Sequence, residues 1–142
     1  MEKTAKYDLE DRLVSFTVLI MEVVEMLPET RAGNHIAGQL VRCGSSPTLN
    51  YSEAQSSSSR SDFINRMNIC LRELRETRVC LKIILKKPLI KNSPQLNIAS
   101  DECNQLISIF VKSIETAKNN RMVTKAKQSF NLDTTNTPEI QI

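Results

Sequence analysis

The most reactive side chains in this sequence are those of four cysteines and a single histidine. The cysteines are Cys43, Cys70, Cys80 and Cys103, and no two of them lie within four residues of each other. Zinc sites are recognised by closely spaced cysteine and histidine pairs, so this pattern predicts no metal site. His35 precedes Cys43 by about two helical turns, which does not favour a Cys-His catalytic pair. The sequence therefore predicts no catalytic residue, no metal and no cofactor.

A metal centre inside a helical bundle is also excluded by the histidine count. Such centres take a Glu-x-x-His pair from each of two helices, and the chain has one histidine. Three of the cysteines fall on predicted apolar stripes, so we expect small buried thiols in a reducing, cytoplasmic protein. The charged start and the short apolar stretch at residues 18–21 predict neither a signal peptide nor a membrane helix.

The charged side chains are unevenly distributed. Residues 1–32 carry four basic and seven acidic side chains, whereas residues 60–91 carry nine basic side chains against three acidic ones. Arg75, Arg78, Lys82 and Lys86 follow one another at spacings of three, four and four, which places them along one side of a helix. This side is either solvated, or paired with acids of the first helix in the same or a neighbouring subunit, or in contact with a polyanion.

Rows of cations on a rigid helix can neutralise nucleic-acid phosphates without reading sequence. Tryptophan is absent and aromatic residues make up 4% of the chain, so contact with the backbone is favoured over base stacking. The candidate residues for binding RNA or DNA are Arg72, Arg75, Arg78, Lys82, Lys86 and Lys87.

Apolar residues recur at helical spacing in four segments. They predict helices over residues 8–27, 33–55, 61–87 and 94–118, with Pro28 and Pro88 ending the first and third. Short connections favour antiparallel neighbours, so we expect an all-α antiparallel four-helix bundle over residues 1–118. Residues 119–142 lack a sustained stripe and predict a flexible polar C-terminal tail.

The second helix carries an unusual proline. Pro47 removes a backbone donor and predicts a kink or a short break there. Asn50 and Glu53 lie one turn apart just beyond it. They are expected to satisfy backbone groups or cap a neighbour, with a binding role as the alternative.

The run from Gln39 to Ala54, together with Ser61-Asp62-Phe63 and residues 71–77, resembles bacterial four-helix bundle proteins encoded in intervening sequences of 23S ribosomal RNA genes. That family includes the accessory variability determinant of diversity-generating retroelements. The resemblance covers about residues 8–118. Its most specific part is the pattern formed by Arg42, Ser46, Pro47, Asn50 and Glu53.

The resemblance implies a ring-shaped homopentamer, a basic surface that contacts nucleic acid and, in the retroelement branch, a reverse-transcriptase partner. It implies no catalytic residues. Several apolar residues lie off the main stripes and are candidates for subunit contacts. They are Val18, Ile64, Val79, Ile83, Ile107 and Ile109.

The first hypothesis from the sequence is a non-enzymatic oligomeric binding module whose third helix meets RNA or DNA, acting as an accessory protein to a reverse transcriptase. The alternative is a structural or protein-interaction oligomer with no nucleic-acid role.

Overall fold

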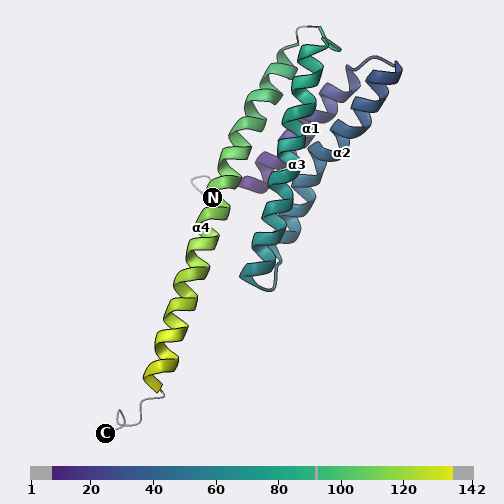
Figure 1. Cartoon of the computed structure of the whole chain (residues 1–142). Coiled ribbons are helices and arrows are strands. Elements are labelled where there is room, and N and C mark those ends of the chain that lie inside the picture. Colours follow the sequence, from purple (N-terminus) through teal and green to yellow (C-terminus); the bar gives the residue numbers. More distant parts are fainter. Residues whose placement is uncertain (1–7, 92, 136–142) are drawn as a thin grey trace, which may run out of the picture.

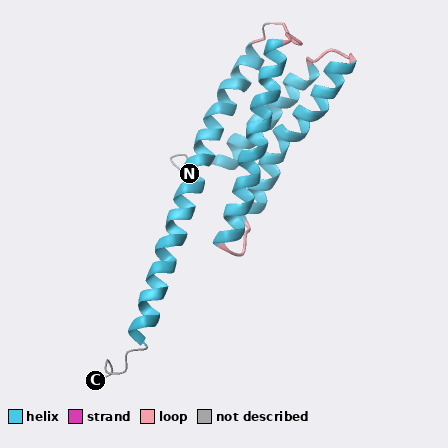
Figure 2. Cartoon of the chain, viewed as in Figure 1, coloured by secondary structure: helices cyan, strands magenta, loops and turns pink. Residues whose placement is uncertain are grey.

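The computed structural model describes residues 8–91 and 93–135. They form four helices: α1 (Leu9–Glu25), α2 (Arg31–Gln55), α3 (Arg60–Lys86) and α4 (Pro94–Thr135). Every regular element of this part of the chain is a helix, as Figure 2 shows. The predicted all-α class is therefore confirmed.

The helices pack side by side as a bundle (Figure 1). α2 packs against α1 and α3, and α4 packs against α3 and α1, so each helix has two neighbours. Short loops join them, so consecutive helices run antiparallel. The largest fully buried side chains come from all four helices and include Phe16, Leu40, Leu74, Leu81 and Phe110. The predicted antiparallel four-helix bundle is confirmed.

Side-chain oxygens cap the beginnings of the helices. Asp8, Thr30 and Ser59 accept hydrogen bonds from backbone N–H groups in the first turns of α1, α2 and α3. Ser93 does the same before Pro94, with its Oγ 3.4 Å from the Leu96 nitrogen. Each cap satisfies a donor that the helix cannot pair by itself.

Loss of the Ser59 cap gives a first testable prediction. The Asp62 nitrogen donates to Ser59 Oγ at 3.0 Å, so Ser59→Ala is expected to lower the free energy of unfolding by about 1 kcal/mol. Ser59→Asp keeps an acceptor and should retain most of that stability. Ser58→Ala, at the exposed neighbouring serine, is the matched control and should have little effect in urea denaturation. Equal losses for Ser58→Ala and Ser59→Ala would contradict the role of the cap.

Of the two predicted effects of Pro47, a kink or a short break, the break is wrong, because α2 continues through the proline from Arg31 to Gln55. The kink stays a prediction. Packing on both sides holds this turn. Thr17 of α1 lies 3.3 Å from the Gly44 carbonyl oxygen and 2.6 Å from Thr48 Oγ1, and the Cys70 thiol of α3 donates to the Pro47 carbonyl at 3.5 Å. Contacts from α1 and α3 therefore hold the turn of α2 around the proline.

The predicted end of the fourth helix at Lys118 is also wrong, because α4 continues to Thr135. Figure 1 shows this helix running far beyond the other three. Among the α4 residues whose burial is described, Ala117 is the last buried one, so the extension leaves the bundle near the predicted boundary. No glycine or proline interrupts residues 118–135, so no residue there forces the helix to end where the apolar stripe does. The rest of the predicted tail lies outside the described residues.

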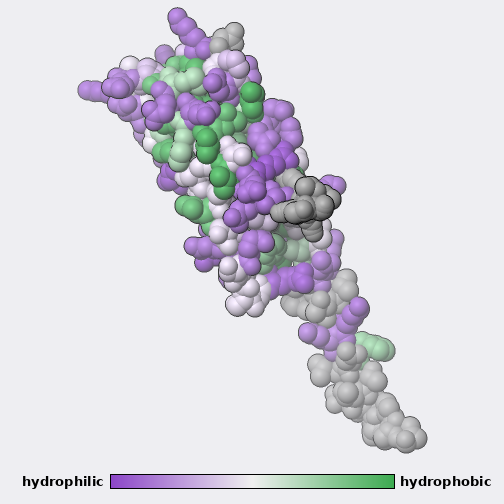
Figure 3. All heavy atoms as spheres, turned by 180° about the vertical axis from the view of Figure 1, so that it is seen from behind, coloured by the Kyte–Doolittle hydropathy of each residue, from purple (hydrophilic) through white to green (hydrophobic). Residues whose placement is uncertain are grey.

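The off-stripe apolar residues divide into two groups. Ile64 and Ile107 are buried and belong to the core, and Ile109 packs against it. Val18, Val79 and Ile83 are 50%, 52% and 42% exposed, so they are the ones available to a partner. The face opposite that of Figure 1 also shows apolar atoms among polar ones over the bundle (Figure 3).

Candidate nucleic-acid interface

The six predicted cations lie on α3 but do not all reach solvent. Arg72, Arg75, Lys82, Lys86 and Lys87 are exposed, whereas Arg78 is half-buried and its buried Nε has no hydrogen-bond partner in the described part of the chain. Arg78 turns towards α4, where its charge acts on the Cys103 thiol. We define the basic α3 surface as the five exposed residues. Arg78 is the predicted residue that the structure does not bring to it.

The exposed cations are almost free of intramolecular ion pairs. In the described residues, the one contact within 4.0 Å joins Arg72 Nη2 to Glu73 Oε2 at 3.9 Å, at the limit of an ion pair. Arg75, Lys82, Lys86 and Lys87 form none. The first helix does not neutralise them within the chain, because α1 packs on α2 and α4, across the bundle from α3.

Arg42 of α2 explains why the acids of α3 leave these cations unpaired. Its Nη1 donates to Glu73 Oε1 at 3.2 Å and its Nη2 donates to Glu76 Oε1 at 2.6 Å. The hydrogen bond with Arg42 lowers the pKa of Glu76, and the same bond raises the pKa of Arg42. One arginine from α2 thus occupies both glutamates that lie among the α3 cations.

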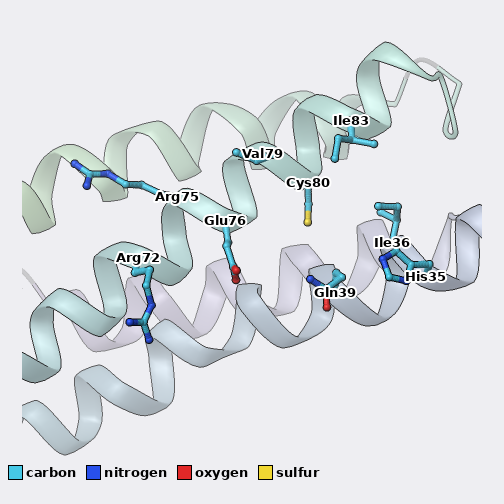
Figure 4. A pocket seen from close by; sticks show the side chains of 9 residues that line it. All are labelled: His35, Ile36, Gln39, Arg72, Arg75, Glu76, Val79, Cys80 and Ile83. Carbon is cyan, nitrogen blue, oxygen red and sulfur yellow. The ribbon is translucent and has the colours of Figure 1, made fainter.

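A groove of about 500 Å³ lies between α2 and α3 beside this cluster. Figure 4 shows Ile36 of α2 facing Ile83 of α3, with the Cys80 sulfur directed towards α2 between them. Arg72 and Glu76 point towards α2, whereas Arg75 points away from it (Figure 4). Sequence reasoning missed this groove, although the off-stripe pair Val79 and Ile83 was its signal.

A second hollow of about 420 Å³ adjoins the groove on α3. It is lined by Lys82, Lys86 and Lys87 together with Val79 and Ile83. The basic α3 surface therefore alternates with apolar side chains. Such a surface offers cations to a phosphate backbone and apolar contact area to a protein.

The motif residues of α2 make intramolecular contacts. Asn50 Nδ2 donates to the Ser46 carbonyl oxygen at 3.0 Å, and Glu53 Oε1 lies 2.6 Å from Arg66 Nη1 of α3. Together with Arg42 and Pro47, they attach α2 to α3 or support its last turns. The motif thus positions the helix that carries the cations.

The four cysteines are free and buried. Burial raises the pKa of Cys70 and of Cys103 to about 12. A hydrogen bond between Cys43 and Cys80 raises the pKa of Cys80 and lowers that of Cys43. Cys70 and Cys103 stay protonated near neutral pH and are poor nucleophiles.

His35 is exposed on the second turn of α2 at the end of the groove. Across residues 8–91 and 93–135, no three His, Cys, Asp or Glu side chains are arranged to hold a metal ion. None of the helices in those ranges is long and apolar enough to cross a membrane.

These features define a small all-α protein, an antiparallel four-helix bundle with a basic third helix. Over residues 6–112 the sequence matches the model of the family described as 23S rRNA-intervening sequence protein. The chain belongs to this family, which confirms the resemblance of the α2 motif. This family is not a known enzyme family.

A solved structure supports the same relationship. A protein with unknown function from the S23 ribosomal protein family of Bacteroides thetaiotaomicron VPI-5482 is 26% identical and aligns with a TM-score of 0.69. The alignment covers 75% of this chain and 98% of that one. No curated protein matches the chain.

Proposed function

We propose that this protein is a non-enzymatic, homo-oligomeric binding module that contacts the phosphates of RNA or DNA through the basic α3 surface. The observation that carries the proposal is the set of five exposed cations on one helix whose neighbouring glutamates are occupied by Arg42. Cations that neutralise the phosphates of a nucleic-acid backbone release its condensed counterions, and this release favours binding.

The family resemblance adds a pentamer as the assembly and, for the retroelement branch of the family, a reverse transcriptase as the protein partner. The exposed Val79 and Ile83 beside the cations support a protein contact at or near the same surface. The predicted cytoplasmic location is part of this proposal, because both partners are found there.

Salt dependence tests the nucleic-acid contact. Lys82→Ala/Lys86→Ala removes two exposed, unpaired cations from one hollow. The slope of log affinity for a 20-base-pair duplex RNA against log salt concentration is expected to fall by about 2, since each phosphate contact contributes roughly 0.9. Fluorescence anisotropy between 50 and 200 mM salt would measure it.

The matched control is Lys118→Ala/Lys127→Ala, which removes the same charge from two exposed positions of α4 away from the basic α3 surface. Its slope should stay close to that of the wild type. Absence of duplex binding by the wild type at low salt, or equal slopes for both variants, would overturn the proposal.

The exposed apolar side chains of α3 favour a second candidate function, a structural oligomer without a nucleic-acid role. In that case Lys82→Ala/Lys86→Ala changes the subunit number measured by light scattering, and the wild type binds no nucleic acid. Under the first proposal the variant keeps the wild-type assembly and loses affinity for duplex.

A further inference from the structure

A separate polar hollow, the junction hollow, lies at the end of the bundle where α3 begins and α4 leaves the core. Its volume is about 370 Å³. The polar and aromatic side chains that line it are Arg60 and Phe63 of α3 and Lys112, Ser113, Thr116 and Asn120 of α4. No carboxylate lines it.

The same Arg60 and Phe63 also line a neighbouring hollow of about 460 Å³ on the α2–α3 loop. Ser57, Ser58 and Ser59 form its other side. The Oγ atom of Ser57 is buried and has no hydrogen-bond partner in the described part of the chain. The loop therefore holds a polar group that the described residues leave without a partner.

The charges of this site are also unneutralised. Arg60 and Lys112 are exposed and form no ion pair within the described residues. The nearest acids along the helices are Asp62, beside the start of α3, and Glu115, one turn from Lys112. Neither lies within 4.0 Å of these cations. The cations therefore present their charge to solvent at the rim of the hollow.

Phe63 is the feature that the basic α3 surface lacks. It is one of only four phenylalanines in the chain, and it is half-buried, packed against the core while lining both hollows. Sites for single-stranded nucleic acid combine an aromatic face, on which a base stacks, with cations that track the backbone. Hydroxyl and amide groups add hydrogen bonds to phosphate or sugar oxygens.

The two sites are separate. Arg60 precedes Lys82 by 22 positions on the same continuous helix, which corresponds to about 33 Å along its axis. One protomer can therefore engage a duplex at the basic α3 surface and an unpaired stretch at the far end of α3.

We infer that the junction of α3 and α4 binds an unpaired nucleotide segment. A base stacks on Phe63, and Arg60 and Lys112 hold the flanking phosphates. This inference rests on the proposed function for the class of ligand, nucleic acid, but it assigns a different site and a different strand state.

Binding of a 12-nucleotide oligouridine, compared with a 12-base-pair duplex RNA, tests the inference. Phe63→Leu is expected to weaken oligouridine binding roughly tenfold and to leave duplex binding unchanged, because base stacking contributes about 1–3 kcal/mol. Phe63→Tyr keeps an aromatic face and should stay within about twofold of the wild type. Arg60→Ala/Lys112→Ala should lower the salt slope for oligouridine by about 1.4, or 0.7 for each phosphate on a single strand.

Arg31→Ala/Lys127→Ala serves as the charge-matched control, since neither residue lines the two hollows. A melting curve for each variant shows whether it folds. If Phe63→Leu does not fold, Phe63→Tyr and Arg60→Ala/Lys112→Ala decide the question.

The outcomes separate the two proposals. Duplex binding that is lost in Lys82→Ala/Lys86→Ala, with oligouridine binding that depends on Phe63, supports both. Duplex binding without any effect of Phe63→Leu or Arg60→Ala/Lys112→Ala on oligouridine overturns this inference alone. Wild-type protein that binds vesicles of phosphatidylglycerol and phosphatidylcholine but neither RNA overturns the nucleic-acid class at both sites.

Discussion

Gly33→Ala is expected to lower the free energy of unfolding by about 2 kcal/mol, or the Tm by roughly 6–8 °C. A Cβ atom on Gly33 would lie 2.0 Å from the carbonyl oxygen of Pro28 and 3.1 Å from its Cγ. The nearest obstacle is backbone, which cannot rotate away as a side chain can. The loop between α1 and α2 must therefore shift, and the Gly33 nitrogen is held within it by a 3.0 Å hydrogen bond to Thr30 Oγ1.

The same helix provides the control. Gly38 is exposed, and a Cβ atom there would meet nothing within 4 Å. Because alanine is preferred over glycine inside a helix, Gly38→Ala is expected to raise the free energy of unfolding by about 0.5–1 kcal/mol. Urea denaturation of the two variants should therefore show changes of opposite sign in the free energy of unfolding, although both replace glycine by alanine. A stabilised Gly33→Ala would mean that the loop relaxes without loss.

These glycines show where sequence reasoning reaches its limit. The four helices could be predicted because each carries its own apolar stripe and local signals such as Ser59 before α3 and Pro94 at the start of α4. Close approaches between helices have no such local signal. Gly44 packs against Ile20 of α1, where a Cβ atom would lie 2.7 Å from Ile20 Cγ2, and only the assembled bundle shows that contact.

The break considered at Pro47 and the early end of α4 have the same origin. Pro47 was expected to kink or break α2 because local propensity was considered alone, and contacts from Thr17 and Cys70 hold the turn together without a break. The end of α4 was placed at Lys118 because the apolar stripe stops there. The apolar stripe indicates where α4 packs against the bundle, however, and residues 118–135 contain no glycine or proline that would end the helix before Thr135.

The candidate interface was predictable in part. Helical spacing placed Arg75, Arg78, Lys82 and Lys86 on one side, but it could not show that α4 packs close enough to half-bury Arg78. The role of Arg42 depends on how α2 lies against α3, which no local pattern encodes. The site around Phe63 was missed because that residue belongs to a core stripe, and only the structure shows it at the edge of two hollows.

Arg42→Ala is expected to lower the Tm by roughly 5 °C. The Glu73 side chain is only 10% exposed, and loss of Arg42 leaves its carboxylate with Arg72 at 3.9 Å as its remaining cation. Arg42 itself is half exposed, but its removal is costly because the Glu73 carboxylate stays desolvated with a weaker partner. Glu73→Gln in the Arg42→Ala background removes that charge and should recover part of the Tm.

Arg66→Ala is the matched control, since it breaks another ion pair between the same two helices. Both Arg66 and Glu53 are largely solvated, at 38% and 60% exposure, so the expected loss is no more than about 2 °C. Thermal unfolding followed by circular dichroism compares the two. Equal losses would show that Glu73 is not the group that makes Arg42 important.

The effect of Arg42 should also depend on pH. The pKa of Glu76 is lowered in the folded protein by its hydrogen bond to Arg42, so this bond stabilises the fold above the ordinary glutamate value of 4.5. Its contribution is lost as the pH falls through the lowered pKa of the folded state. The difference in Tm between the wild type and Arg42→Ala should therefore be larger at pH 7 than at pH 3. A difference that is the same at both pH values would mean that Arg42 acts through packing of its aliphatic stem.

The same substitution frees Glu73 and Glu76 beside the α3 cations, so it should weaken duplex binding at pH 7 although it removes no residue of the basic α3 surface.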